Sequence, residues 1–455
     1  MGPKTAEVVG WGAPAPVAGR EEPGAAEGTS PALPWHVVLL FAAACGLSVA
    51  DVYFAHPLLD AMARDLAIDP AAVGGVVTVT QVGYALGLVF IVPLGDLLDR
   101  RRLVVGQALL SALALTVVGL APTAAVLLAG LAVVGLLAVV VQVLVAFAAT
   151  LAAPAERGRV VGTVTSGVVV GILLARFAAG LLADLGGWRA VYLASAALTL
   201  VMAGLLFRTL PRLATDPAAP SYPALIRSVA ALFRDEPLLR VRAVLALLIF
   251  ATFNVLWAPL VLPLSAPPFS LSHTEVGLFG LAGVAGALGA SRAGRLADRG
   301  LGQRTTGLAL GLMLAAWLPI ALLDVSLWIL VAGVVVLDFA IQAIHVTSQS
   351  LLFAARPEAR SRLVGAYMAF YSVGSAAGAL ASTAVYARAG WPGVCGLGAA
   401  ISLAALVFWA TTRSVGRATT STSSRRKNGP GHSRSGQDEN HPEDETGCAS
   451  ETLRW

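Results

Sequence analysis

From Trp35 onward, long apolar runs alternate with short polar breaks along most of the chain. A helix that spans a bilayer needs about 20 predominantly apolar residues, and the pattern contains twelve runs of about that length. One of them, Val276–Ala290, is short and is expected to continue to Ala297. The sequence therefore predicts an all-α membrane protein with twelve transmembrane helices in two six-helix bundles.

Polar stretches divide this pattern. The longest internal break, 211–242, places Leu225, Val229 and Leu232 on one helical face, which predicts an amphipathic helix on the membrane surface. The C-terminal tail is interpreted as solubilising, with a regulatory or partner-binding role as the alternative. The predicted organisation is a disordered cytoplasmic tail at 1–34, an N-terminal six-helix bundle at 35–210, a cytoplasmic linker at 211–242, a C-terminal six-helix bundle at 243–412 and a second disordered cytoplasmic tail at 413–455.

Composition supports the membrane prediction. Of the 455 residues, 57% are apolar and 13% are charged, whereas soluble domains are about 45–50% apolar and about 25% charged. A soluble enzyme and a disordered chain are therefore both excluded. The sequence contains no Gly-Lys-Ser/Thr phosphate loop, no His-Glu-x-x-His and no Cys-x-x-Cys, so no ATP motor, metal, cofactor, nucleic-acid partner or enzymatic activity is expected.

Basic residues fix a predicted orientation. With the N-terminus in the cytoplasm, 27 of the 31 lysines and arginines fall in cytoplasmic segments. The outer loops then hold only Arg64, Arg189 and Arg388, and Arg176 lies within a span. Because cytoplasmic loops carry an excess of Lys and Arg, both termini are predicted to be cytoplasmic. The scarcity of lysine against arginine favours a GC-rich bacterial source, and hence the inner membrane of a bacterium.

The two halves of the chain resemble each other. Gly187-Trp188 recurs as Gly390-Trp391, and Asp51-Val52 aligns with Asn254-Val255, both at a spacing of 203 residues. A loop motif recurs at a similar spacing of 199, with Gly95, Asp99 and Arg100 in one copy and Gly294, Asp298 and Arg299 in the other. Six spans per half make this a parallel repeat, which predicts a substrate site between the halves near the membrane midplane.

The loop Gly294-Arg-Leu-Ala-Asp298-Arg299-Gly-Leu-Gly-Gln-Arg304 resembles the loop signature of the major facilitator superfamily, and 95–102 resembles a shortened copy. Within that superfamily, Asp51-Val-Tyr-Phe-Ala-His-Pro-Leu-Leu59 resembles a first-span pattern of bacterial drug:proton antiporters, a group similar to sugar-efflux permeases. The resemblance implies alternating access, a monomer, and a cytoplasmic gating role for the loop motifs; a simple topology anchor is the alternative. The chain departs from the pattern in span five, which lacks Gly-Pro, and in span four, where Gln142 stands and the usual Arg is missing.

Charged residues inside a membrane are expensive, so each needs a partner, water or a function. Asp51 in span one and Arg176 in span five lie at similar depths, because both spans run outward and 1.5 Å of rise separates successive residues. A pair between them is geometrically open, and it would be either a structural ion pair or a proton-responsive switch.

Span ten carries a polar stripe. Asp338, Gln342, His345 and Gln349 stand at i, i+4, i+7 and i+11, which places them on one helical face. The stripe is interpreted as a cavity wall in which Asp338 or His345 takes up protons, with interhelical hydrogen bonding as the alternative. Further candidates for the substrate cavity are polar or aromatic residues in other spans: Gln81, Tyr84, Gln142, Asn254, Trp257, Tyr367 and Tyr371.

The family resemblance, together with the carboxylates inside the spans, implies a secondary transporter that exports a small drug-like, metabolite or sugar molecule, coupled to protons, with a role in drug resistance. Asp51 and Asp338 are the expected protonation sites, Arg176 the counter-charge and His345 an accessory relay. The alternatives are an importer or facilitator on the same fold and a membrane sensor that does not transport.

Overall fold

The computed structural model describes residues 33–153, 156–211, 221–284, 295–355 and 360–413, and every regular element within them is helical. Gly294 and both predicted tails beyond these ranges lie outside the described residues, as does the expected continuation of the Val276 span over 285–294. The side chain of Asp298 is likewise not described.

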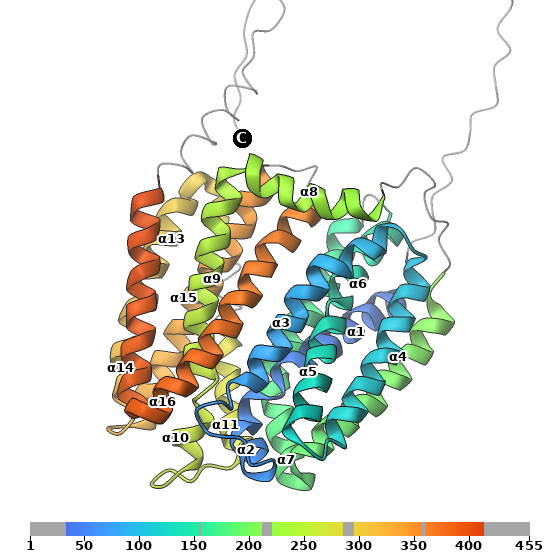
Figure 1. The fold of residues 1–455 in the computed structure, drawn as a ribbon. Helices are drawn as coiled ribbons and strands as arrows, with labels where there is room; N and C mark the ends of the chain where they lie inside the picture. The colour runs from blue at the N-terminus through green and yellow to red at the C-terminus, as the bar shows by residue number, and fades with distance from the viewer. Residues whose placement is uncertain (1–32, 154–155, 212–220, 285–294, 356–359, 414–455) are drawn as a thin grey trace, which may run out of the picture.

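The helices form two bundles that lie side by side (Figure 1). The N-terminal half contains α1 (Trp35–Tyr53), η1 (His56–Leu58), α2 (Leu59–Asp65), α3 (Gly75–Phe90), η2 (Val92–Asp96), α4 (Arg100–Gly119), α5 (Ala124–Ala138), α6 (Val140–Leu151) and α7 (Arg157–Thr209). After the linker helix α8 (Tyr222–Asp235), the C-terminal half contains α9 (Pro237–Trp257), α10 (Val261–Ser265), α11 (His273–Leu278), η3 (Phe279–Ala282), η4 (Ala297–Leu301), α13 (Gly302–Ala315), α14 (Trp317–Ala321), α15 (Leu327–Ala355) and α16 (Arg360–Thr412).

Two helices are of double length and show the internal repeat. Helices α7 and α16 each contain 53 residues and each bend at one glycine, Gly187 with φ 77° and Gly390 with φ 60°. Only glycine adopts positive φ without a steric penalty from Cβ, so the same residue makes the same turn 203 positions apart. Each double helix thus supplies two of the predicted spans.

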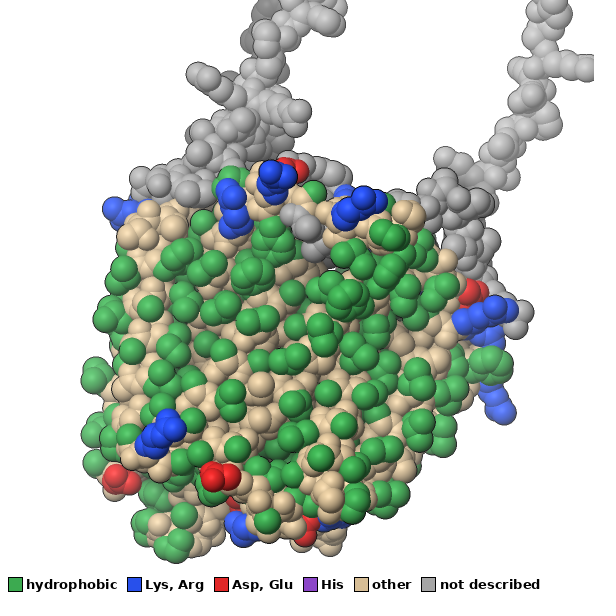
Figure 2. Space-filling model, viewed as in Figure 1, with side chains coloured by type: hydrophobic (Ala, Val, Ile, Leu, Met, Phe, Trp, Pro, Cys, Tyr) green, Lys and Arg blue, Asp and Glu red, His purple; other side chains and the backbone are tan. Residues whose placement is uncertain are grey.

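The surface has the character of a membrane protein. Eight described helices are long and apolar enough to cross a bilayer, including the two double-length ones. In the view of Figure 2, charged side chains gather toward the two ends of the molecule, and hydrophobic side chains cover the broad band between them. The twelve-span prediction agrees with this architecture once α7 and α16 are each divided and the shorter α3 and α11 are included.

We call the end where α1 begins and α16 ends the terminal face, and the opposite end the distal face (Figure 1). Linker helix α8 lies across the terminal face, as its amphipathic pattern predicts, and the Tyr222 hydroxyl donates to the Phe90 carbonyl oxygen at 2.8 Å. The halves contact each other through α3 against α16 and α7 against α11. Gly74 and Gly180 permit this approach, because a Cβ at either would overlap a backbone carbonyl of the other half, that of Ala379 or His273.

Candidate functional site

Arg176 of α7 lies at the boundary between the halves. It is 3% exposed, and its guanidinium carbon lies 3.8 Å from the ring centroid of Trp257, 5.2 Å from that of Tyr53 and 5.4 Å from that of Phe253. Trp257 and Phe253 belong to α9 of the other half. A desolvated cation over aromatic faces contributes about 2 kcal/mol, so Arg176 attracts the two halves to each other.

Asp338 of α15 completes this arrangement. Its carboxylate is 3% exposed and accepts a hydrogen bond from the Trp257 indole N–H at 3.2 Å. It also interacts electrostatically with Arg176. We call Tyr53, Arg176, Phe253, Trp257 and Asp338 the central cluster. A guanidinium from one half and a carboxylate from the other thus contact the same indole ring, that of Trp257.

The pair considered between Asp51 and Arg176 is not present in the part of the chain that the structure describes. Among the described residues, Asp51 accepts a hydrogen bond from the Ser195 hydroxyl at 2.6 Å, within the N-terminal half. Equal depth along the membrane normal does not fix the direction in which a side chain points around its helix. Asp51 points toward the second arm of α7, whereas Arg176 points across the boundary.

The polar stripe of α15 points toward neighbouring helices. His345 hydrogen-bonds through Nδ1 to the Tyr367 hydroxyl at 3.0 Å and through Nε2 to the Gln349 amide at 3.3 Å. The Phe250 ring of α9 meets the His345 ring edge to face at 5.2 Å between centroids. Two members of the stripe therefore make the interhelical hydrogen bonds of the alternative interpretation, His345 to Tyr367 in α16 and Asp338 to Trp257 in α9, whereas the bond between His345 and Gln349 lies within α15. Gln342 and Gln349 are half-buried.

Two contacts that the sequence analysis did not single out also join the halves. The hydroxyls of Tyr53 in α1 and Tyr371 in α16 lie 2.6 Å apart. His56 in η1 hydrogen-bonds through Nε2 to the Asn254 side-chain oxygen in α9 at 3.2 Å. Tyr53 and His56 both belong to the first-span pattern that begins at Asp51, and this was the signal that could have identified them.

A small pocket lies directly beside these contacts. Residues of both halves line it: His56, Pro57, Arg176, Trp257, Leu260, Val261 and Val276. The guanidinium Nε and Nη2 of Arg176 have no hydrogen-bond partner among the described residues. The pocket therefore combines aromatic and aliphatic walls with free donors, but its volume of about 10 Å³ is room for about one water molecule in this conformation.

The remaining cavity candidates lie apart from the central cluster or support it. Tyr84 in α3 hydrogen-bonds the Gln142 side chain in α6. Gln81 is 1% exposed, and its side-chain oxygen has no partner within the described part of the chain. Tyr84 and Gln142 thus contact each other inside the N-terminal half.

The first copy of the loop motif organises a helix end near the terminal face. Asp99 caps α4 by accepting from the Arg102 backbone N–H at 2.8 Å. Arg100 donates to the Gly95 carbonyl at 2.9 Å and to the Thr150 hydroxyl at 2.6 Å. These contacts lie within the N-terminal half. In the second copy, Arg299 is exposed.

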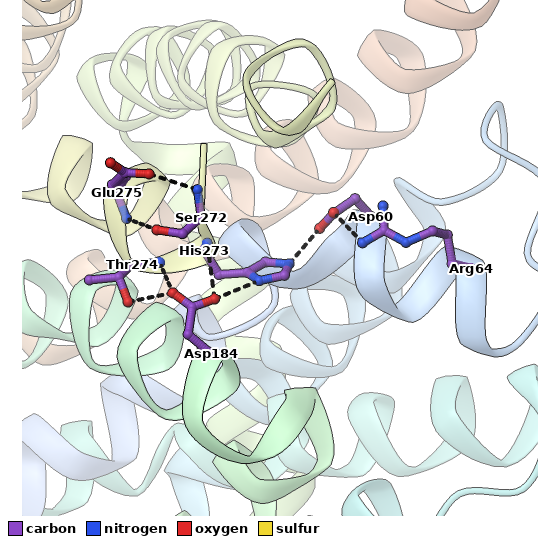
Figure 3. A network of polar contacts seen from close by, with 7 residues as sticks. All are labelled: Asp60, Arg64, Asp184, Ser272, His273, Thr274 and Glu275. Carbon is purple, nitrogen blue, oxygen red and sulfur yellow. Dashed lines mark hydrogen bonds and ion pairs between the residues drawn. The ribbon is translucent and has the colours of Figure 1, made fainter. Parts of the chain in front are cut away.

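A second group of charges joins the halves at the distal face (Figure 3). His273, the first residue of α11, lies between Asp60 of α2 and Asp184 of α7. Sequence analysis placed these residues in polar breaks and gave them no role. We call Asp60, Arg64, Asp184, Ser272, His273, Thr274 and Glu275 the distal cluster.

Comparison with known proteins agrees with the fold. The family model of the Major Facilitator Superfamily matches residues 40–323 and 243–437. The chain is 46% identical over 380 residues to "Uncharacterized transporter YgaY" of Escherichia coli O157:H7, covering 84% of this chain and 95% of that protein. It is 32% identical over 392 residues to "Probable transporter SCO4007" of Streptomyces coelicolor, covering 85% and 90%.

Solved structures show the same architecture. A bacterial homolog of the human lysosomal transporter Spinster, in an inward-facing and occupied conformation, superposes with a TM-score of 0.67 at 16% identity, covering 85% of this chain and 97% of that one. The human organic anion transporter MFSD10 gives a TM-score of 0.60 at 20% identity, covering 83% and 100%. At these identities the likeness is one of fold. The chain belongs to the Major Facilitator Superfamily and is a multi-pass membrane transporter, not an enzyme.

Proposed function

We propose that the chain is a secondary active exporter of a small molecule, driven by inward proton flow, with the terminal face in the cytoplasm of a bacterium. The observation that carries this proposal is the buried carboxylate of Asp338, which faces Arg176 across the boundary of the two halves. In alternating access the halves rock about a central site. A charge pair that spans the boundary is remade in every cycle.

In this proposal Asp338 couples the movement of substrate to the movement of protons. A buried charge whose partner leaves is strongly destabilised, so Asp338 needs Arg176, a proton or a substrate donor at each stage. A proton and a substrate that compete for one carboxylate move in opposite directions, which is antiport. When Asp338 binds neither a proton nor a substrate, its attraction to Arg176 holds the distal side closed. The unloaded transporter therefore does not change state without moving a substrate or a proton.

The other coupling candidates take secondary roles in this proposal. Asp51, hydrogen-bonded to Ser195, is a second protonation site within the N-terminal half. His345, between Tyr367 and Gln349, is a relay on the same face of α15 as Asp338. Arg176 acts as counter-charge to Asp338.

Substrate contacts come from the pocket beside Arg176. Its rings and aliphatic side chains suit a drug-like or metabolite-like molecule, and a sugar would stack on Trp257. We place the chain with the drug:proton antiporters and sugar-efflux permeases, as a monomer with a role in drug resistance. Gating by the Gly95–Arg100 loop and its second copy belongs to the same proposal.

The test uses the full-length protein in proteoliposomes that contain a fluorescent pH indicator. An exporter that exchanges protons changes the internal pH when a transported compound is added, and the panel is ethidium, chloramphenicol and arabinose. Asp338→Asn should abolish this proton signal while exchange of labelled substrate for unlabelled substrate persists. The matched control is Asp324→Asn, the same change at an exposed acid.

An unchanged proton signal in Asp338→Asn would refute the coupling role. Accumulation of substrate on the terminal-face side of oriented vesicles would identify an importer instead. Binding of a compound without any flux would identify a sensor.

A further inference from the structure

We propose that His273 is a proton-binding site at the distal mouth, and that its protonated form holds the two halves together there. The direction in which this acts, from outside the cell, rests on the orientation in the proposed function. The site itself rests on the geometry of the distal cluster (Figure 3).

Both nitrogens of the His273 ring face carboxylates of the other half. Nε2 lies 3.2 Å from Asp60 Oδ1, and Nδ1 lies 3.0 Å from Asp184 Oδ1. A carboxylate can only accept a hydrogen bond, and a neutral imidazole has one N–H donor. Only the doubly protonated ring donates on both sides, so this arrangement is complete when His273 carries a proton.

The backbone around His273 fixes the same geometry. The His273 N–H donates to Asp184 Oδ1 at 3.2 Å, and the Thr274 N–H and hydroxyl donate to Asp184 Oδ2 at 2.8 Å and 2.6 Å. Gly180 packs directly against the His273 carbonyl. The backbone contacts thus fix the position of the His273 ring between the two carboxylates.

All charged groups packed around the ring are accounted for among the described residues. Asp60 also pairs with Arg64 at 2.8 Å, and Arg64 is 67% exposed. Glu275, on the same helix as His273, accepts from the Ser272 N–H at 2.8 Å. His56 of η1, which packs against α11, hydrogen-bonds to Asn254. Two carboxylates therefore face His273, and one of them, Asp60, is shared with Arg64.

Protons from solvent reach this site. The side chain of His273 is 21% exposed. The hydrogen bond to Asp60 raises the pKa of His273 above its ordinary value; partial burial opposes this, and Asp184 adds to it. The contact is fully formed below the ordinary histidine pKa of about 6.5 and is lost as pH rises through the raised pKa.

The consequence for transport is directional. When the distal side is open, an acidic exterior protonates His273, and closure then joins the imidazolium to Asp60 and Asp184. At alkaline external pH the neutral ring leaves one carboxylate facing a lone pair, and closure is weaker. External protons thereby favour the step that returns the transporter to its inward-facing state.

The experiment measures the opening of the distal mouth directly and needs no substrate. Spin labels are placed at Leu185→Cys, an exposed position beside the bend of α7 at Gly187, and at Val325→Cys, an exposed position just before α15 begins. The background is Cys448→Ser, reconstituted in nanodiscs. Distance distributions are recorded between pH 5 and pH 9. We expect a longer-distance population that grows with pH, with a midpoint above pH 6.5, which is about the ordinary histidine value.

Variants identify the titrating group. His273→Gln, which keeps one donor, should remove this pH dependence, and Asp60→Asn and Asp184→Asn should each lower its midpoint by about one pH unit. His36→Gln, the same change at an exposed histidine of the terminal face, should leave it unchanged. Monodispersity of each variant excludes misfolding.

An unaltered midpoint in His273→Gln would overturn the proposal, as would a distance that does not respond to pH in the parent protein. These outcomes are distinct from failure of the export proposal. Asp338→Asn should keep the distal transition of His273 even where proton-coupled flux is lost. A transporter that proves to be an importer would still show the transition.

Discussion

The central cluster and the distal cluster both join the two halves with charged groups, but they are built differently. In the central cluster Arg176 is 3% exposed and meets aromatic faces, and two of its nitrogens have no hydrogen-bond partner among the described residues. In the distal cluster His273 is partly exposed, and hydrogen bonds saturate its ring nitrogens. Unused donors on a buried side chain suit an exchange of partners, whereas saturated hydrogen bonds near solvent suit a contact that opens and closes with proton concentration.

The largest expected effect comes from removing the charge of the central cluster. Asp338→Asn should reduce proton-driven flux about 100-fold or more, which corresponds to about 2.7 kcal/mol, because the amide cannot exchange a proton. Flux driven by an imposed pH gradient measures it, with Asp324→Asn as control. If Asp338→Asn kept its gradient-driven flux, the central cluster would not be the site of proton coupling, and the two clusters would no longer differ in function.

A steric change at the boundary should come next. Gly74→Ala places a methyl group against the Ala379 carbonyl of the other half, whereas a Cβ at Gly75 meets nothing within 4 Å. We expect Gly74→Ala to shift the distal spin-label distances toward the open population, and Gly75→Ala to leave them unchanged. Equal behaviour of the two variants would show that close approach of α3 and α16 does not control closure.

Arg176→Lys separates charge from shape at the central cluster. Lysine keeps the positive charge but loses the planar group that stacks on Trp257. Transport should fall about tenfold, or about 1.4 kcal/mol, in an exchange assay without a pH gradient. Arg240→Lys, at an exposed position of α9, should transport normally; full activity of Arg176→Lys would show that charge alone suffices.

The smallest expected effect is the pH response of the distal cluster. The pKa of His273 is raised in the folded protein, so the bound proton stabilises the distal cluster. Protection of the α11 backbone amides against hydrogen exchange should therefore fall as pH rises from 6 to 9. The rates are corrected for the pH dependence of intrinsic exchange. His273→Gln should flatten the profile. If α13 amides lose protection in parallel, the response is global and the distal cluster is not its source.

Much of the architecture follows from sequence because its causes are local. Apolar run length sets the spans, and the repeat predicted that Gly187 and Gly390 occupy equivalent places, where the structure has two positive-φ turns. The stripe from Asp338 to Gln349 was predicted as one face because helical periodicity determines it. Membership of the superfamily was indicated by the loop motif and confirmed by the family match.

The pairing of charges could not be predicted in the same way. Depth alone suggested Asp51 for Arg176, yet the side-chain direction around each helix assigns Ser195 to Asp51 and Trp257 to Arg176. His273 meets Asp184 and Asp60 at sequence separations of 89 and 213 residues. Such contacts depend on how the bundles dock, and a single sequence carries little information about that.

One helix carries a member of each cluster. Asp184 and Arg176 lie eight residues apart on the first arm of α7, about 12 Å along its axis. A helix segment of this length moves as a stiff rod, so displacement at one residue is transmitted mechanically to the other. If the distal face is the outer one, as proposed, a proton that binds His273 from outside and fixes Asp184 would therefore also act on the position of Arg176 without moving to it.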